Sequence, residues 1–344
     1  MKAMLLEGPN TAFELVNMPD PTASPGEAVA RVITCGSGLT IQHVKAGRRV
    51  AAFPRIIGHE ISGEIVSVGP GVSTLAVGDG VTAYYYLNCG RCRWCLANLE
   101  PLCANTGGNV GVDCDGGYAE YIKLPARIFI KLPESLDYKA HPAEIGVITD
   151  ALATPYKVLR RARIKPGETI AIFGAGGGLG IHQVMMGKWA RARVVAVDVA
   201  TNKFEACRKA GADAVVDPRS CDVVEALLDL TSGSGVDVVI DYVSATSTLE
   251  AGAKALGRRG RLVTLGGAGQ PFQASARDML SKEQDLLGSR YVTRAEMLET
   301  CDLVARGEVW PLVSDVRPLE EAEAVHERLE RGEVTGRAAL RIAK

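Results

Sequence analysis

Hydrophobic and polar residues follow two different patterns along the chain. In about the first 150 residues, short apolar runs are separated by glycine and proline, at residues 28–34, 61–68, 80–87 and 118–124. Short strands at such intervals are typical of an antiparallel β body. From about residue 151 the pattern changes to strands that alternate with helices, which predicts a doubly wound parallel sheet.

The second pattern predicts five strands and the helices between them. The strands are expected at residues 169–173, 193–197, 214–216, 236–242 and 260–265, and two of the helices at 203–210 and 223–228. After about residue 288 the pattern is less regular, and residues 333–342 end in an apolar stretch typical of a strand. We therefore expect an α/β fold. A Rossmann doubly wound domain would span 151–289, and a mostly antiparallel β domain would combine 1–150 with the returning tail, 290–344.

One βαβ unit, residues 168–198, carries the clearest chemical signal. The apolar run 169–173 meets a glycine cluster, a helical pattern follows, and a β-branched run then ends at Asp198. Glycine has no Cβ, so the turn can close tightly and the backbone can approach a pyrophosphate, while the helix N-terminus offers free N–H groups. The expected dinucleotide contacts in this turn are Gly174, Ala175, Gly176, Gly177, Gly178, Leu179 and Gly180.

Asp198 determines which dinucleotide is expected. It lies 18 residues after Gly180, where a carboxylate can accept hydrogen bonds from both ribose hydroxyls and repels a 2′-phosphate. No arginine follows it in residues 199–203, so NAD(H) is favoured over NADP(H). Ala175 replaces the first glycine of the usual fingerprint, and a glycine-rich turn without a ligand is the alternative. The strand, helix, second strand and acid together favour dinucleotide binding.

Composition limits the class of protein and its partners. The 344 residues suffice for two domains with substantial cores, and 47% hydrophobic residues indicate a globular protein. With a net charge of −1 and no long basic run, nucleic acid and anionic membranes are poor partners. The expected partner is a small-molecule substrate. The N-terminus lacks a secretory pattern, and no segment approaches the roughly eighteen apolar residues of a membrane span. We expect a cytoplasmic protein.

Four of the nine cysteines are clustered at metal-binding spacing. Cys89, Cys92, Cys95 and Cys103 form C-x2-C-x2-C-x7-C. Four thiolates this close in sequence can complete a tetrahedral shell with no open position, which predicts structural zinc. An iron–sulfur cluster and four unliganded thiols are the alternatives. The scattered cysteines are expected to be small buried apolar residues, with Cys35 as the exception; they are Cys35, Cys114, Cys207, Cys221 and Cys301.

Together these motifs resemble those of the zinc-containing medium-chain dehydrogenase/reductase family, which includes alcohol dehydrogenases. The resemblance covers essentially the whole chain, in the family's order. The matching residues are Cys35-Gly36-Ser37, Gly58-His59-Glu60 with Gly63, Gly78-Asp79, the four cysteines, residues 116–121, Asp150 with Thr154-Pro155-Tyr156, and the glycine turn with Asp198. It implies a GroES-like catalytic domain with a zinc lobe at 89–103, a central Rossmann domain, an active site in the cleft, and a homodimer or homotetramer.

The resemblance also implies roles for cofactor-binding residues outside the glycine turn. Lys203 would hold the adenine ribose beside Asp198. Arg337 would meet the pyrophosphate, with Arg341 as the runner-up. The residues expected near the nicotinamide are Thr154, Gly266 and Gly267.

A second, catalytic zinc is implied by Cys35, His59 and Asp150, and Glu60 matches the acid beside the histidine. One thiolate, one imidazole and one carboxylate leave a tetrahedral position open for water or a substrate oxygen. Zinc there would polarise a carbonyl or lower the pKa of an alcohol. Ser37 matches the hydroxyl that takes the alcohol proton. A buried thiol with a structural histidine and aspartate is the alternative.

Two positions depart from the family pattern Cys-Gly-Ser-Asp-x-His. Gly38 replaces an aspartate that supports the zinc-bound histidine, and losing such support typically costs about ten- to a hundred-fold in metal affinity or activity. Thr40 replaces the histidine that passes the proton to water. His43 could serve instead, although a surface histidine is the alternative. The histidines expected to be structural are His141, His182 and His326.

These residues predict a zinc-dependent NAD(H) alcohol dehydrogenase or carbonyl reductase that transfers hydride between the substrate carbon and the nicotinamide. Two alternatives stay open. An NADH-dependent reductase of an activated C=C bond, in an enone or enoyl-CoA, would send hydride to the β carbon and hold the enolate by hydrogen bonds. Basic clusters at 160–165 and 258–261 could meet a CoA phosphate, but each is more often a solvated face. The other alternative is a catalytically silent NAD-binding protein.

Overall fold

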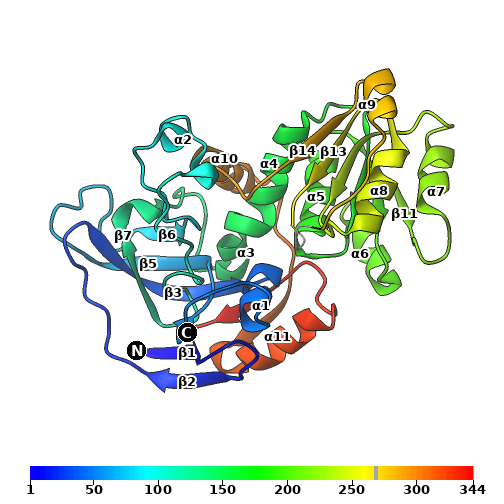
Figure 1. The fold of residues 1–344 in the computed structure, drawn as a ribbon. Helices are drawn as coiled ribbons and strands as arrows, with labels where there is room; N and C mark the ends of the chain where they lie inside the picture. The colour runs from blue at the N-terminus through cyan, green and yellow to red at the C-terminus, as the bar shows by residue number, and fades with distance from the viewer. Residues whose placement is uncertain (267–269, 344) are drawn as a thin grey trace. The chain divides into compact units, whose positions relative to one another are not determined.

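The computed structural model describes residues 1–266 and 270–343, which fold into two compact units (Figure 1). Unit 1 comprises Met1–Ala153 and Thr293–Lys344, and unit 2 comprises Thr154–Val292. Unit 1 is therefore built from two segments far apart in the sequence, and unit 2 from the segment between them.

Two β-sheets form the body of unit 1. The smaller has the order β2-β1-β4, and the larger has the order β15-β16-β3-β5-β6-β8, with β7 pairing with β3 off this path. Their bounds are β1 (Lys2–Leu6), β2 (Phe13–Asn17), β3 (Glu27–Ser37), β4 (Arg55–Ile56), β5 (Glu60–Val68), β6 (Gly80–Ala83), β7 (Tyr121–Pro125), β8 (Phe129–Lys131), β15 (Val313–Pro318) and β16 (Arg337–Arg341). All pairs are antiparallel except β15 with β16.

Strand β3 connects the two segments of unit 1. On one side it pairs with the C-terminal strand β16, with Ala338 opposite Ser37. On the other side it pairs with β5, with Cys35 opposite Ile61 and Gly36 opposite Glu60. The end of β3, which carries the Cys35-Gly36-Ser37 motif, is thus held between strands from both ends of the chain.

The helices of unit 1 are short, except for α10. They are α1 (Leu39–Lys45), α2 (Arg93–Leu96), η1 (Glu100–Leu102), η2 (Ala126–Ile128), α3 (Pro142–Val147), η3 (Ile148–Leu152), α10 (Arg294–Ala305), η5 (Leu319–Glu321) and α11 (Ala322–Glu330). Helix α10 begins with a capping box, in which the Thr293 hydroxyl accepts from Glu296 N–H and the Glu296 carboxylate accepts from Thr293 N–H. Helix α3 continues into η3, a single π-helical turn of the kind that is frequent at functional sites.

Unit 2 is a parallel sheet with the strand order β11-β10-β9-β12-β13-β14. Its strands are β9 (Thr169–Phe173), β10 (Arg193–Val197), β11 (Ala214–Val216), β12 (Val236–Asp241), β13 (Leu256–Thr264) and β14 (Asp285–Gly288). Its helices are α4 (Ala153–Ala162, beginning at the last residue of unit 1), α5 (Gly178–Trp189), η4 (Thr201–Lys203), α6 (Phe204–Lys209), α7 (Val223–Leu230), α8 (Thr246–Ala255) and α9 (Ala276–Lys282).

The order of the strands reverses at β9. From β9 the chain proceeds to β10 and β11, and it then returns to β12 on the other side of β9. Helix α5 packs on β9 and β10, and α8 packs on β12 and β13. Right-handed crossovers in opposite directions place these helices on opposite faces of the sheet, and ligands bind such sheets at the carboxyl ends of the strands where the order reverses. The expected α/β fold class is confirmed.

Several expected elements have other bounds. The strand expected at 80–87 is wrong beyond Ala83. The Tyr84 N–H still donates to Ile128 O at 2.8 Å in register with β8, but Tyr85 O and Leu87 N–H then bond to Val110 and Gly108 instead. Tyr84, Tyr85 and Tyr86 are buried side chains without a continuous ladder, so they imitate a strand pattern. The helix expected at 203–210 is η4 followed by α6, and the strand expected at 260–265 begins earlier, as β13.

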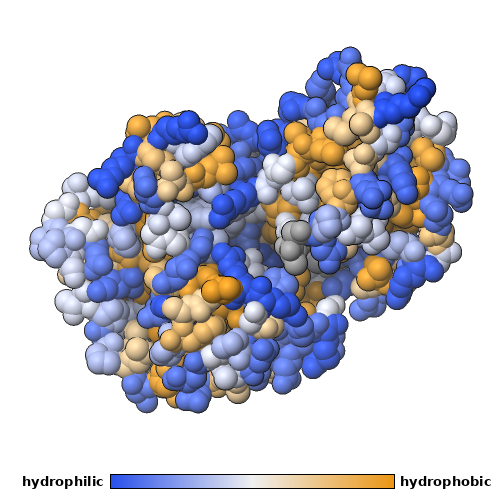
Figure 2. All heavy atoms as spheres, in the orientation of Figure 1, coloured by the Kyte–Doolittle hydropathy of each residue, from blue (hydrophilic) through white to orange (hydrophobic). Residues whose placement is uncertain are grey.

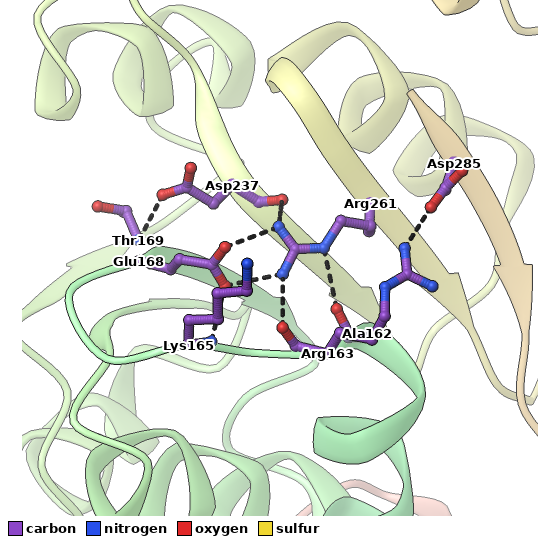
Figure 3. Close-up of polar contacts among 8 residues, drawn as sticks. All are labelled: Ala162, Arg163, Lys165, Glu168, Thr169, Asp237, Arg261 and Asp285. Carbon is purple, nitrogen blue, oxygen red and sulfur yellow. Dashed lines mark hydrogen bonds and ion pairs between the residues drawn. The ribbon is translucent and has the colours of Figure 1, made fainter. Parts of the chain in front are cut away.

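A buried arginine on β13 joins the starts of β9 and β12 to the end of α4 in unit 2 (Figure 3). Arg261 on β13 donates to the two Glu168 carboxylate oxygens at 3.0 and 2.7 Å, directly before β9. Its other acceptors are the carbonyls of Ala162, Arg163 and Asp237. The guanidinium therefore uses its donors within the fold. Arg261 is 7% exposed, so it acts as a structural residue and is not free to meet a phosphate.

The surface combines both residue types. On the face drawn in Figure 2, hydrophobic patches are separated by hydrophilic side chains. Among the described residues, none of the helices has the length and apolar character that crossing a membrane requires.

Candidate functional site

The four clustered cysteines meet around α2 and η1 in unit 1. The Sγ–Sγ distances are 3.6 Å for Cys92–Cys95, 3.9 Å for Cys92–Cys103 and 4.0 Å for Cys89–Cys95. Zn–S bonds of about 2.3 Å in a tetrahedron place the sulfurs about 3.8 Å apart. The four residues therefore fit one zinc ion with no position left open.

The surroundings of these thiols favour thiolates at two positions. Hydrogen bonds from the backbone N–H groups of Cys95 and Ala104 lower the pKa of Cys92 to about 6. A hydrogen bond from Arg91 N–H is the main cause that lowers the pKa of Cys89. Burial and the neighbouring thiols raise the pKa of Cys95 to about 12. All nine cysteines are free, and the thiolate is the form that binds a metal.

The scattered cysteines only partly match their expected burial. Cys35, Cys207 and Cys301 are buried, Cys114 is half-buried, and Cys221 is exposed. The expectation of a small buried side chain is therefore wrong for Cys221.

The glycine turn of unit 2 joins the carboxyl end of β9 to the N-terminus of α5. A Cβ at Gly180 would lie 2.0 Å from the Gly174 carbonyl oxygen, so only glycine lets the helix approach the turn this closely. Gly177 is the N-cap of α5, and the first N–H groups of the helix lack helical acceptors. This is the arrangement that binds phosphates.

Asp198 closes this turn from the end of β10. Its carboxylate accepts from Gly176 N–H at 2.7 Å and from Ala200 N–H at 2.8 Å. Lys203 is also buried here, and burial lowers its pKa although the Asp198 charge opposes that shift. The structure therefore brings Asp198 and Lys203 to the glycine turn, since a Cβ at Gly176 would meet both side chains.

The remaining expected cofactor residues of unit 2 are less closely grouped. Thr154 is buried near the start of α4. Gly266 follows β13 with a φ of 120°, which is left-handed backbone that favours glycine. Gly267 lies outside the described residues.

A second group of possible metal ligands is buried in unit 1. One ligating atom each from His59, Glu60 and Asp150 lies within 4.8 Å of the others. His59 immediately precedes β5, Glu60 begins β5, and Asp150 lies on the π-helical turn η3. His59 Nε2 is 3.5 Å from Asp150 Oδ2. Glu60 Oε2 is buried and has no hydrogen-bond partner among the described residues, so a cation there would relieve a desolvated carboxylate.

Cys35 does not belong to this group of three. Its Sγ lies 3.6 Å from Gly36 O and beside Gly58. A Cβ at Gly36 would point at the Glu60 side chain, and successive residues of a strand point to opposite faces. The Cys35 side chain therefore leaves β3 on the other face from Glu60. Burial and the Glu60 charge raise the pKa of the Cys35 thiol well above its usual value.

Arg337 is the cation beside the buried carboxylates. Its guanidinium lies 2.9 Å from Glu60 Oε1 and 2.9 Å from Asp150 Oδ2. Burial is the largest influence on Glu60 and raises its pKa, while Arg337 acts in the opposite direction. The side chain expected to meet a pyrophosphate is therefore buried within unit 1, where it pairs with two expected metal-site residues. Arg341, the runner-up, is exposed.

Thr40 and His43 are the residues considered for the proton exit. Both residues lie on α1, half-buried. His43 Nδ1 accepts from Arg48 Nε at 2.8 Å. Burial and the Arg48 charge lower the pKa of His43. Ser37 instead hydrogen-bonds to the Tyr118 hydroxyl.

His326 is the site residue whose polar contacts the sequence does not signal. It is fully buried on α11 between the Tyr118 hydroxyl and the Gln42 amide. It lies 208 residues after Tyr118, and no motif spacing links the two. His182 Nδ1 contacts Gly178 O at 2.6 Å within α5, which agrees with a structural role, and His141 is exposed.

Two family models match the chain. They are described as "Alcohol dehydrogenase GroES-like domain", over residues 21–134, and "Zinc-binding dehydrogenase", over residues 178–306. An alcohol dehydrogenase of Geobacillus stearothermophilus is 34% identical over 99% of each chain. An NAD-dependent alcohol dehydrogenase of Sulfolobus acidocaldarius is 31% identical over 99% of this chain and 100% of its own.

A solved structure agrees over the same length. The crystal structure of the alcohol dehydrogenase from Aeropyrum pernix superposes with a TM-score of 0.91 at 33% identity, over 99% of this chain and 100% of that one. Identity above 30% over nearly the whole chain shows shared family and not fold alone. The chain belongs to the zinc-containing medium-chain dehydrogenase/reductase family of oxidoreductases, on its alcohol dehydrogenase-like side.

Proposed function

We propose that the protein is an NAD(H)-dependent alcohol dehydrogenase or carbonyl reductase. The observation that carries this is the buried nitrogen and oxygen donor group of His59, Glu60 and Asp150 in unit 1. The relatives named alcohol dehydrogenase support the same chemistry. A zinc ion held there would supply a Lewis acid for a hydroxyl or carbonyl oxygen.

Residues of the protein itself would bind the metal, the substrate and the cofactor. His59 and Asp150 would hold the metal, and Glu60 would complete its shell in place of the expected Cys35, whose side chain leaves β3 on the other face. Ser37 would accept a hydrogen bond from the substrate hydroxyl. In unit 2, the N-terminus of α5 would bind the pyrophosphate, and the Asp198 carboxylate would bind the adenosine ribose of NAD(H). Each carboxylate oxygen has more than one lone pair, so the contacts to Gly176 and Ala200 leave acceptor capacity.

The four-cysteine lobe would hold a structural zinc, apart from the reaction. Its role would be to fix residues 89–103, where only short helices form. We also propose that the protein is cytoplasmic and forms a homodimer or homotetramer. Light scattering on the purified protein would measure its oligomeric state.

One observation favours a second candidate function. Arg337 already neutralises Glu60 and Asp150 without a metal, and Cys35 lies outside the donor group. An NADH-dependent reductase of an activated C=C bond would need no metal, because hydrogen bonds can hold the enolate.

A cofactor-coupled screen separates the candidates. Alcohols, ketones, aldehydes, enones and enoyl-CoA esters would be tested with NAD(H) and NADP(H), with zinc measured on the same sample. Two zinc ions per chain and NAD-linked alcohol turnover support the proposal. One zinc with turnover of enones alone supports the C=C reductase. NADH binding without turnover of any acceptor would indicate a silent binder.

A further inference from the structure

A chain of hydrogen bonds runs through unit 1 from Ser37 to the surface. The Ser37 hydroxyl bonds to Tyr118 OH, and Tyr118 OH lies 2.9 Å from His326 Nε2. His326 Nδ1 lies 2.6 Å from Gln42 Oε1, and Gln42 Nε2 donates to Glu330 at 2.7 Å. These residues come from β3, the loop before β7, α11 and α1, so the tertiary fold alone brings them together.

At the surface end of this series of hydrogen bonds, the donor and the acceptor of each bond are fixed. Arg48 donates to both Glu330 oxygens at 2.6 Å, and this contact holds the pKa of Glu330 at about 2. An ionised carboxylate only accepts hydrogen bonds. The Gln42 amide must therefore present its NH2 group to Glu330 and its oxygen to His326.

The orientation of the Gln42 amide also fixes which ring nitrogen of His326 carries the hydrogen. Because Gln42 Oε1 only accepts, His326 Nδ1 must carry the hydrogen. Burial, with Lys45 as the nearby charge, lowers the pKa of His326 to about 3, so the ring is neutral and Nε2 is an acceptor. The uncharged groups that face the ring are the Phe13 edge, the Tyr118 hydroxyl and the Gln42 amide.

The acceptor at His326 Nε2 in turn fixes the direction of the hydrogen bond between Tyr118 and Ser37. Tyr118 donates its hydroxyl hydrogen to His326 Nε2, so its oxygen accepts from Ser37. The Ser37 hydrogen is then committed to Tyr118, and the lone pairs of Ser37 are what remains for another partner. Reversing the last bond would require reversing each bond behind it, up to the Arg48–Glu330 pair.

We propose that Tyr118, His326, Gln42 and Glu330 are positioning residues that hold the Ser37 oxygen as a hydrogen-bond acceptor for the substrate. The proposal rests on the proposed function, in which Ser37 contacts the substrate oxygen. It adds a substrate preference: an oxygen that carries hydrogen, as in an alcohol, matches this polarity, and a carbonyl oxygen does not. Tyr118 and His326 therefore orient the Ser37 hydroxyl in a protein that has Thr40 at the position of the family's histidine.

The polarity can be measured without any activity. The protein has five histidines, so the ring ¹⁵N signals of ¹⁵N-histidine-labelled protein can be assigned by comparison with the His326→Gln variant. We expect the His326 signals at neutral pH to show a hydrogen on Nδ1 and a bare Nε2. A hydrogen on Nε2, or a charged ring, overturns the proposal whatever the protein catalyses.

An activity measurement tests the proposal at Glu330, the surface end of the series of hydrogen bonds. Glu330→Gln allows the Gln42 amide to flip, and Glu327→Gln is the matched control, since Glu327 lies on the same helix and pairs with Arg331 instead. We expect Glu330→Gln to lower kcat for alcohol oxidation at least threefold, with KM for NAD and zinc content unchanged, and Glu327→Gln to change neither.

A swap of the two outer groups supplies the rescue. In the double variant Gln42→Glu with Glu330→Gln, the amide at position 330 donates to the carboxylate at position 42. That carboxylate accepts from His326 Nδ1, so His326 Nε2 is again an acceptor for the Tyr118 hydroxyl. We expect kcat to return to within about twofold of the unmodified protein. Equal kcat in Glu330→Gln and Glu327→Gln, or no recovery in the swap, overturns the proposal. If the unmodified protein oxidises no alcohol while the ¹⁵N result holds, the proposed function fails and the polarity stands.

Discussion

The guanidinium of Arg337 occupies the space that a side chain at residue 38 would need. A Cβ built on Gly38 would lie 2.4 Å from Arg337 Nη1. Gly38, which replaces the family's aspartate, therefore leaves room for an arginine from the other end of the chain, and this arginine pairs with the buried Glu60 and Asp150 carboxylates. A guanidinium only donates hydrogen bonds, so Arg337 fills this space without taking over an aspartate's role as acceptor for a histidine N–H.

Restoring the family's aspartate should harm this protein. Gly38→Asp would collide with the Arg337 guanidinium, which would have to shift and would push the Glu60 and Asp150 side chains that it contacts out of position. We expect an approximately tenfold loss of affinity for the second zinc, measured by competition with a chromophoric chelator. The double variant Gly38→Asp with Arg337→Met, in which the space is free, should recover most of the loss. A gain of zinc affinity in Gly38→Asp alone would show that the two groups do not compete.

Removing the cation should destabilise the metal-free protein. Arg337→Met leaves two buried carboxylates without their partner, and breaking a buried ion pair in this way costs about 3–5 kcal/mol. Thermal unfolding in the presence of chelator would report this as a lowered Tm that zinc partly restores. Arg341→Met on the same strand is the control, because Arg341 is exposed. Equal Tm losses in both variants would contradict the importance of the Arg337 pairs.

The shell of the second zinc is tested by removing its donors one at a time. His59→Asn should reduce zinc from two ions per chain to one, because His59 is the nitrogen donor of the group. Cys35→Ser should keep two ions if Glu60 completes the shell, as the grouping of side chains favours, whereas Glu60→Gln should lose one. The opposite pattern, measured by elemental analysis, would assign the shell to the thiol.

Buried neutral His326 should make the fold sensitive to acid. Its pKa is depressed to about 3 in the folded protein, whereas an unfolded histidine titrates near 6.5. Between these values only the unfolded chain binds the proton, so stability is full above about pH 6.5 and is lost as the pH falls toward 3, by about 1.4 kcal/mol per pH unit. The His326→Phe variant should show a shallower decline of Tm over this range, and exposed His141→Gln should not. Parallel curves for all three proteins would contradict this assignment.

The sequence predicts the strands of unit 2 well for a physical reason. Thr169–Phe173 and Arg193–Val197 have the expected bounds because strands covered on both faces are continuous apolar runs. Residues 80–87 mislead because Tyr84 to Tyr86 are buried by tertiary packing and not by a ladder. The local pattern of hydrophobic residues indicates which side chains are buried, and burial alone does not distinguish a strand from a packed loop.

The site shows the same limit. The zinc-lobe cysteines are close in sequence, so their spacing already contains the geometry that brings the sulfurs 3.6 to 4.0 Å apart. The pairing of Arg337 with Glu60 joins residues 277 apart, and that of His326 with Tyr118 joins residues 208 apart. Neither can be obtained from local spacing. Motif reasoning therefore found the donors and missed the groups that orient them.

Zinc content and alcohol turnover, measured on one preparation, test the buried donor group most directly. Metal-replete protein should contain two zinc ions per chain and reduce NAD in the presence of an alcohol, and His59→Asn should lose one zinc together with that activity while still binding NADH. Full alcohol oxidation by a His59→Asn protein that holds a single zinc would contradict the assignment of this group to the reaction.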